Sequence, residues 1–83
     1  YATFGTLELA VNAVKAMGMK NAVLLANHGV NAVGSSLEHA FAVLEQVEYC
    51  SRLQLIARSA GQPIVIEDAE MNRIIEKFKS YGQ

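Results

Sequence analysis

The 83-residue chain has a single cysteine, a single proline, no tryptophan and no excess of either charge. Because Cys50 stands alone, a disulfide within the chain is excluded, and a reducing cytoplasm is the expected location. Seven basic and eight acidic residues give a net charge of -1, so we expect no nucleic-acid partner. No apolar run approaches the roughly 18 residues of a membrane span, and no secretion signal is recognisable. We therefore expect no membrane partner either.

What the chain does contain is apolar residues, at 52% of the total. Soluble domains usually contain about 45–50%, and a chain this short has limited capacity to bury a core. The surplus predicts apolar faces that something beyond these residues covers. The chain also starts at Tyr1, directly in patterned sequence, from which we expect it to be a piece of a longer protein or a processed chain.

Three stretches show the apolar period of amphipathic helices. The first begins after the capping residue Thr6, ends at Gly18 and carries an apolar stripe of Leu7, Ala10, Val11, Val14 and Met17. The second runs from Leu37 to about Ser59, opens with the capping box Ser35-x-x-Glu38, and ends before Gly61 and Pro63. Its broad stripe consists of Leu37, Ala40, Phe41, Leu44, Val47 and Leu55. In the third, Asp68 is the predicted cap and the inward-facing residues are Met71, Ile74, Ile75 and Phe78.

Two β-prone runs, Ala22–Ala26 and Val30–Val33, flank the sequence Asn27-His28-Gly29. A three-residue connection containing glycine predicts a β-hairpin with a left-handed residue. Both runs are almost wholly apolar, which predicts strands buried on both faces. Two strands alone are marginal in water, and Ile64–Ile66 is the other candidate strand.

His28, at the predicted hairpin tip, has two interpretations. It is either a turn histidine that hydrogen-bonds the hairpin backbone, or a metal ligand on a rigid support that Gly29 lets another group approach closely. A catalytic zinc needs three protein ligands, and the chain contains no H-x-H, H-E-x-x-H or C-x-x-C motif. His39 is expected to be solvent-exposed. These residues alone therefore do not complete a metal site.

The remaining candidates have ordinary structural interpretations beside functional ones. Tyr81 follows the third predicted helix and is either an anchoring side chain or a proton donor. Phe4 and Phe78 are by default packing residues. Cys50, with no base or second cysteine near it in the sequence, is expected to be a small apolar residue of the core.

Three segments together point to a known family: Tyr1-Ala2-Thr3-Phe4-Gly5-Thr6, then Leu24-Leu25-Ala26-Asn27-His28-Gly29, then Glu76-Lys77-Phe78-Lys79-Ser80-Tyr81-Gly82. They resemble the class II aldolase/adducin family, and the likeness spans essentially all 83 residues but only the C-terminal two-fifths or so of a family member. The resemblance implies an α/β fold, with residues 1–83 as the C-terminal part of one α/β/α layered domain. The element order would be helix, β-hairpin, long helix, short extended segment and C-terminal helix.

The resemblance also implies a site. The histidine that matches His28 is the third ligand of a catalytic zinc in family members, and an upstream His-x-His supplies the other two. The tyrosine matching Tyr81 reaches the site of a neighbouring subunit as a proton donor to the aldehyde oxygen, and the phenylalanines matching Phe4 and Phe78 line the aldehyde end of the pocket. An upstream glutamate acts as base, and the assembly is a homotetramer.

The opening and closing segments are most similar to the members that reversibly cleave L-fuculose 1-phosphate to dihydroxyacetone phosphate and L-lactaldehyde. Since the other ligands, the base and the phosphate-binding loops lie outside these residues, we expect the chain alone to be inactive. Two alternatives remain open. One is a relative that epimerises L-ribulose 5-phosphate at carbon 4 with similar metal chemistry, and the other is a non-catalytic, adducin-like assembly domain.

Overall fold

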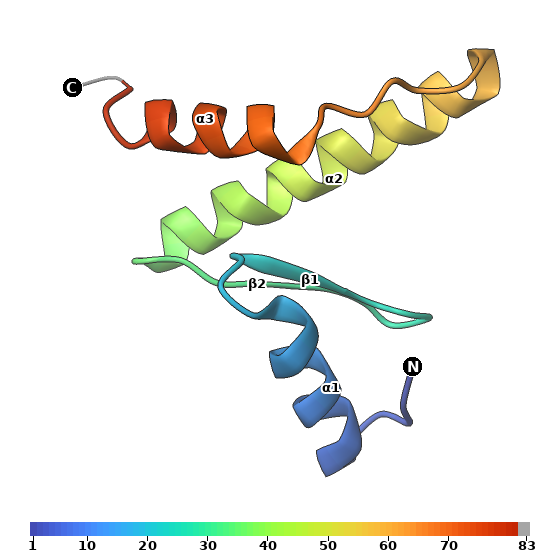
Figure 1. The fold of residues 1–83 in the computed structure, drawn as a ribbon. Helices are drawn as coiled ribbons and strands as arrows, with labels where there is room; N and C mark the ends of the chain where they lie inside the picture. Colours follow the sequence, from blue (N-terminus) through green and yellow to red (C-terminus); the bar gives the residue numbers. More distant parts are fainter. Residues whose placement is uncertain (82–83) are drawn as a thin grey trace.

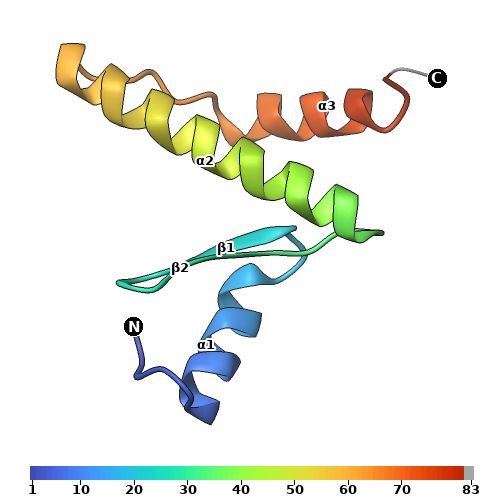
Figure 2. The same ribbon diagram turned by 180° about the vertical axis from the view of Figure 1, so that it is seen from behind.

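The fold is a β-hairpin held between two helices, followed by a third helix. The computed structural model describes residues 1–81 and contains, in order, α1 (Leu7–Met17), β1 (Ala22–Leu25), β2 (Gly29–Ala32), α2 (Leu37–Ala60) and α3 (Asp68–Phe78). The antiparallel hairpin contacts α1 on one side and α2 on the other (Figures 1 and 2). The predicted α/β class and order of elements are therefore confirmed.

Helix α1 has the predicted ends but packs through a different face. The Thr6 hydroxyl accepts a hydrogen bond from the Leu9 N–H at 3.2 Å, and Gly18 closes the helix with a φ of 54°. The half-buried residues of α1 are Leu9, Ala13 and Met17, whereas the predicted stripe residues Leu7, Val11 and Val14 are 80%, 54% and 74% exposed. The helix is apolar on two sides, and the hairpin covers only one of them.

The hairpin reverses direction at residues 26–28, between the paired residues Leu25 and Gly29. The backbone takes positive φ values at Asn27 (64°) and Gly29 (141°), which short polar residues and glycine tolerate best. The prediction that both strands are buried on both faces is wrong, because Leu24 is 69% exposed and residues alternate between half-buried and exposed along β2. The helices of this chain leave part of the sheet bare.

Helix α2 begins one residue later than the predicted capping box implies. The Ser36 hydroxyl, not that of Ser35, accepts the His39 N–H at 3.1 Å. The imidazole Nδ1 of His39 in turn accepts the Ser35 N–H at 3.1 Å. In a capping box, a second side chain bonds back to a backbone N–H at the start of the helix. His39 has that role here instead of the predicted Glu38, and two backbone donors at the helix start are therefore satisfied.

Gly34 makes the tight turn from β2 into α2 possible, since a Cβ atom there would lie 2.6 Å from the Ala40 nitrogen and 2.9 Å from the His39 ring. We predict that Gly34→Ala destabilises the full-length protein by about 1–3 kcal/mol through overpacking. Gly61→Ala is the matched control, because a Cβ at Gly61 meets nothing within 4 Å. Urea unfolding of both variants tests this, and equal midpoints would contradict it.

The segment after α2 departs from the predictions. Within residues 1–81, Ile64–Ile66 joins no strand, and Ile64 and Val65 are 97% and 85% exposed. Helix α3 starts after Glu67 with no side-chain cap, so the predicted capping by Asp68 is wrong. Of its predicted inward-facing residues only Ile74 is half-buried. The physical reason is that, in the described part of the chain, α3 packs closely against no other helix or strand.

The molecule is more open than a compact protein of the same mass. Its accessible surface is 7335 Å², against about 4,900 Å² for a compact protein of this size. Its radius of gyration is 15.1 Å, against about 12 Å. Ala2 is the only buried apolar residue among residues 1–81. No helix within those residues is long and apolar enough to cross a membrane.

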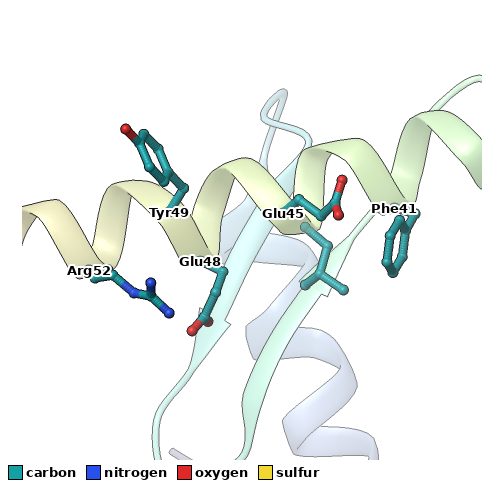
Figure 3. Close-up of a pocket in the computed structure, with 6 residues that line it drawn as sticks. Phe41, Glu45, Glu48, Tyr49 and Arg52 are labelled. Carbon is teal, nitrogen blue, oxygen red and sulfur yellow. The ribbon is translucent and has the colours of Figure 1, made fainter.

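Part of this bare surface forms an open groove along α2. Figure 3 shows side chains of the groove, from Phe41 to Arg52, projecting from α2, and the volume of the groove is about 470 Å³. The lining residues are Phe41, Leu44, Glu45, Glu48, Tyr49 and Arg52. Phenylalanine, tyrosine and arginine are enriched in protein–protein contacts, whereas glutamate is depleted there.

Candidate active site

His28 lies at the hairpin tip, where the segment before α1 meets it (Figure 1). The ring nitrogen Nε2 is 2.8 Å from the carbonyl oxygen of Ala2, in a partly buried contact. Because a carbonyl only accepts hydrogen bonds, Nε2 carries the hydrogen. In the neutral ring the lone pair is then on Nδ1. The backbone of Ala2 therefore selects the tautomer of His28.

The segment before α1 is itself shaped by local contacts. The Thr6 hydroxyl donates to the Thr3 carbonyl at 2.7 Å, and Gly5 turns the chain with a φ of 73°. Ala2 is 5% exposed, so the carbonyl that meets His28 comes from the most buried residue described. The ring of Tyr1 lies flat on the imidazole, with centroids 5.3 Å apart and planes 8° apart.

These contacts fit a single metal ligand. Histidines that bind metals commonly donate their second ring hydrogen to a backbone carbonyl or a carboxylate, and this bond sets the tautomer and the ring direction. His28 has such a bond. Among residues 1–81, however, no three His, Cys, Asp or Glu side chains gather closely enough to hold a metal ion. His39 is engaged at the start of α2. Within residues 1–81, His28 therefore has no companions that would complete a metal site.

Phe4 belongs to the same segment as Ala2 and is 79% exposed. The pocket-lining role that the sequence resemblance implies for Phe4 stays a prediction.

Tyr81 and Phe78 form a separate pair at the end of α3. Their rings meet edge to face, with centroids 5.9 Å apart. With Ile74 and Lys77 they line an open hollow of about 350 Å³. In both ribbon views the end of α3 and the hairpin tip lie on opposite sides of the molecule (Figures 1 and 2). The structure of one chain therefore brings Tyr1, Ala2 and His28 together but not His28 and Tyr81.

The sequence pattern did not indicate the contributions of Tyr1 and Ala2. Tyr1 had a signal, since it opens one of the three segments that carry the family resemblance. No sequence signal pointed to the Ala2 carbonyl. Every residue has a backbone carbonyl, and only the fold decides which of them meets a side chain.

Comparison with known proteins gives one family and several relatives. The family model described as Class II Aldolase and Adducin N-terminal domain matches residues 1–55. The chain is 41% identical over 83 residues to the 5-deoxy-D-ribulose 1-phosphate aldolase of Bacillus thuringiensis, covering 100% of this chain and 39% of the relative. No solved structure gives a significant match.

Two other relatives are similar to nearly the same extent. The 5-methylthioribulose-1-phosphate/5-deoxyribulose-1-phosphate aldolase of Rhodospirillum rubrum is 40% identical over 82 residues, covering 99% of this chain and 37% of the relative. The L-fuculose phosphate aldolase of Escherichia coli K12 is 39% identical over 83 residues, covering 99% of this chain and 39% of the relative. The chain thus spans about two-fifths of the length of these relatives.

Proposed function

Because the chain belongs to the class II aldolase and adducin family, we propose that it is the C-terminal part of a zinc-dependent aldolase acting on a ketose 1-phosphate. Residues 1–83 form part of a single domain, and a His-x-His outside them supplies the remaining metal ligands. The observation that carries the proposal is His28, held at a hairpin tip by a backbone carbonyl with one ring nitrogen available. The chain alone is inactive because it lacks those ligands.

Zinc, when bound, supplies positive charge that polarises the ketone carbonyl of the substrate. His28 would be one of the residues that hold the ion. A histidine ligand binds as the neutral ring, and the bond from Nε2 to the Ala2 carbonyl would hold that ring in one tautomer.

Tyr81 exchanges a proton with the aldehyde oxygen. In the condensation direction its phenol donates a proton to the aldehyde oxygen, and in the cleavage direction the phenolate takes it back from the substrate hydroxyl while the carbon–carbon bond breaks. Phe78 meets the Tyr81 ring edge to face, which restricts the directions that the phenol can take. Phe4 and Phe78 form the apolar wall around the aldehyde.

His28 and Tyr81 must come from different subunits to share a site, because they lie on opposite sides of one chain (Figures 1 and 2). We assign the assembly as a homotetramer located in the cytoplasm. The groove on α2 and the bare stripe of α1 (Leu7, Val11 and Val14) are covered by the rest of the same polypeptide and by neighbouring subunits. Together these contacts supply the core that 83 residues do not form.

The substrate is L-fuculose 1-phosphate, on the likeness of the opening and closing segments. The second candidate is 5-deoxy-D-ribulose 1-phosphate, since a relative named for that activity is 41% identical, against 39% for the relative named for L-fuculose phosphate. Cleavage of either yields dihydroxyacetone phosphate. The aldehydes differ, because the first substrate releases L-lactaldehyde and the second releases acetaldehyde. Both aldehydes end in a methyl group, which suits an apolar wall.

The test uses the full-length protein that contains this chain, loaded with zinc. Each ketose 1-phosphate is supplied in turn, dihydroxyacetone phosphate is measured by enzymatic reduction with NADH, and the aldehyde is identified by derivatisation. We expect release from at least one of the two substrates and no epimerisation of L-ribulose 5-phosphate. Epimerisation without cleavage would replace the proposal by the epimerase alternative. Absence of both reactions would favour an assembly domain.

A further inference from the structure

The contact between Tyr1 and His28 has no place in the mechanism above, although it joins residues 27 positions apart. The two rings are nearly parallel, at 8°, with centroids 5.3 Å apart. We propose that Tyr1 is a positioning residue, which acts with the Ala2 carbonyl to fix the imidazole plane of His28 toward the metal. This proposal rests on the proposed function, in which His28 is a metal ligand.

The hydrogen bond alone leaves the ring partly free. It fixes the position of Nε2 relative to the Ala2 oxygen at 2.8 Å, but the ring can still pivot about this point. The torsion between the side-chain methylene and the imidazole is also soft, with a broad energy minimum. A metal-binding nitrogen needs a defined lone-pair direction, so one further restraint on the ring plane is required.

The Tyr1 ring supplies that restraint. A flat ring stacked on the imidazole disfavours tilting, because tilting opens the contact on one edge and closes it on the other. The hydrogen bond and the stack thus act on different motions of the same ring. Both come from two adjacent residues of one segment.

Ordinary core packing does not account for the contact. Tyr1 is 70% exposed, and His28 is exposed as well. A core residue would be surrounded on several sides, whereas Tyr1 places one ring face on one side chain. Phe4, in the same segment, is also aromatic and exposed, yet it makes no ring contact with His28 within residues 1–81. The stack is therefore specific to Tyr1 rather than a general clustering of aromatic rings.

The experiment compares Tyr1→Phe, which keeps the stack, with Tyr1→Leu, which removes it, in the full-length protein. Zinc affinity is measured on metal-free protein by competition with a chromogenic chelator. We expect Tyr1→Phe to stay within about twofold of the unmodified protein and Tyr1→Leu to bind about 10-fold more weakly, as for loss of an outer-shell partner of a metal ligand. The visible absorption spectrum of the Co²⁺-substituted protein should shift in Tyr1→Leu alone.

Unchanged zinc affinity and cobalt spectrum in Tyr1→Leu would overturn the proposal. Equal weakening in Tyr1→Phe would overturn it too, since the hydroxyl rather than the ring face would then matter. Tyr1→Met is a second non-aromatic variant in case Tyr1→Leu fails to fold, and urea unfolding identifies that failure. His28→Ala separates this proposal from the proposed function: zinc retained without His28 refutes the function, whereas zinc lost with His28 but kept in Tyr1→Leu refutes only the role of Tyr1.

Discussion

Replacing His28 by Ala in the full-length protein is expected to abolish stoichiometric zinc. The imidazole is one of three expected protein ligands. Within residues 1–81, no group of His, Cys, Asp or Glu side chains could hold the metal in its place. The loss of affinity should exceed the roughly 10–100-fold that loss of an outer-shell partner costs. Metal analysis after dialysis measures this, and aldol cleavage should fall with the metal content.

His39→Ala is the matched control for this variant, as it removes the chain's other histidine. Its ring caps the start of α2, where Nδ1 accepts the Ser35 N–H at 3.1 Å. Loss of that cap should lower stability by about 1 kcal/mol and leave the zinc content at one ion per subunit. Full metal content in His28→Ala would refute the ligand assignment, whereas metal loss in both variants would point to general unfolding.

Replacing Tyr81 by Phe should slow turnover by about 10²–10⁴-fold, the range that a positioned proton donor contributes. The edge-to-face contact with Phe78 depends on the ring and not on the hydroxyl, so folding and assembly should be preserved. Zinc content and the mass of the oligomer are measured beside the rate. Loss of the tetramer in this variant would show that Tyr81 is mainly structural.

The separation of His28 and Tyr81 allows a sharper experiment. If each site takes His28 from one subunit and Tyr81 from its neighbour, co-expression of His28→Ala and Tyr81→Phe subunits should give activity well above that of either variant alone. Random assembly would make roughly one quarter of the sites complete. Co-expression of His28→Ala with a His28→Ala, Tyr81→Phe double variant is the control and should remain inactive. Absence of recovery in mixed oligomers would place both residues in the same subunit.

Local rules were enough to determine much of this fold. Thr6 and Gly18 fix the ends of α1 because capping depends on side chains within one turn of each other. Asn27 and Gly29 allow the positive φ values of the hairpin turn for an equally local reason. The two apolar runs and the long apolar stripe of α2 then gave the order of elements, and three short segments were sufficient to indicate the family.

The tertiary structure decided everything that depends on partners distant in sequence. It selected Leu9, Ala13 and Met17 as the packed face of α1, since an apolar stripe does not specify what covers it. It also left Ile64–Ile66 outside the sheet. Above all, it brought the Ala2 carbonyl and the Tyr1 ring to His28 and kept Tyr81 on the far side. A residue's identity predicts what chemistry it offers, but its neighbours follow from the path of the whole backbone.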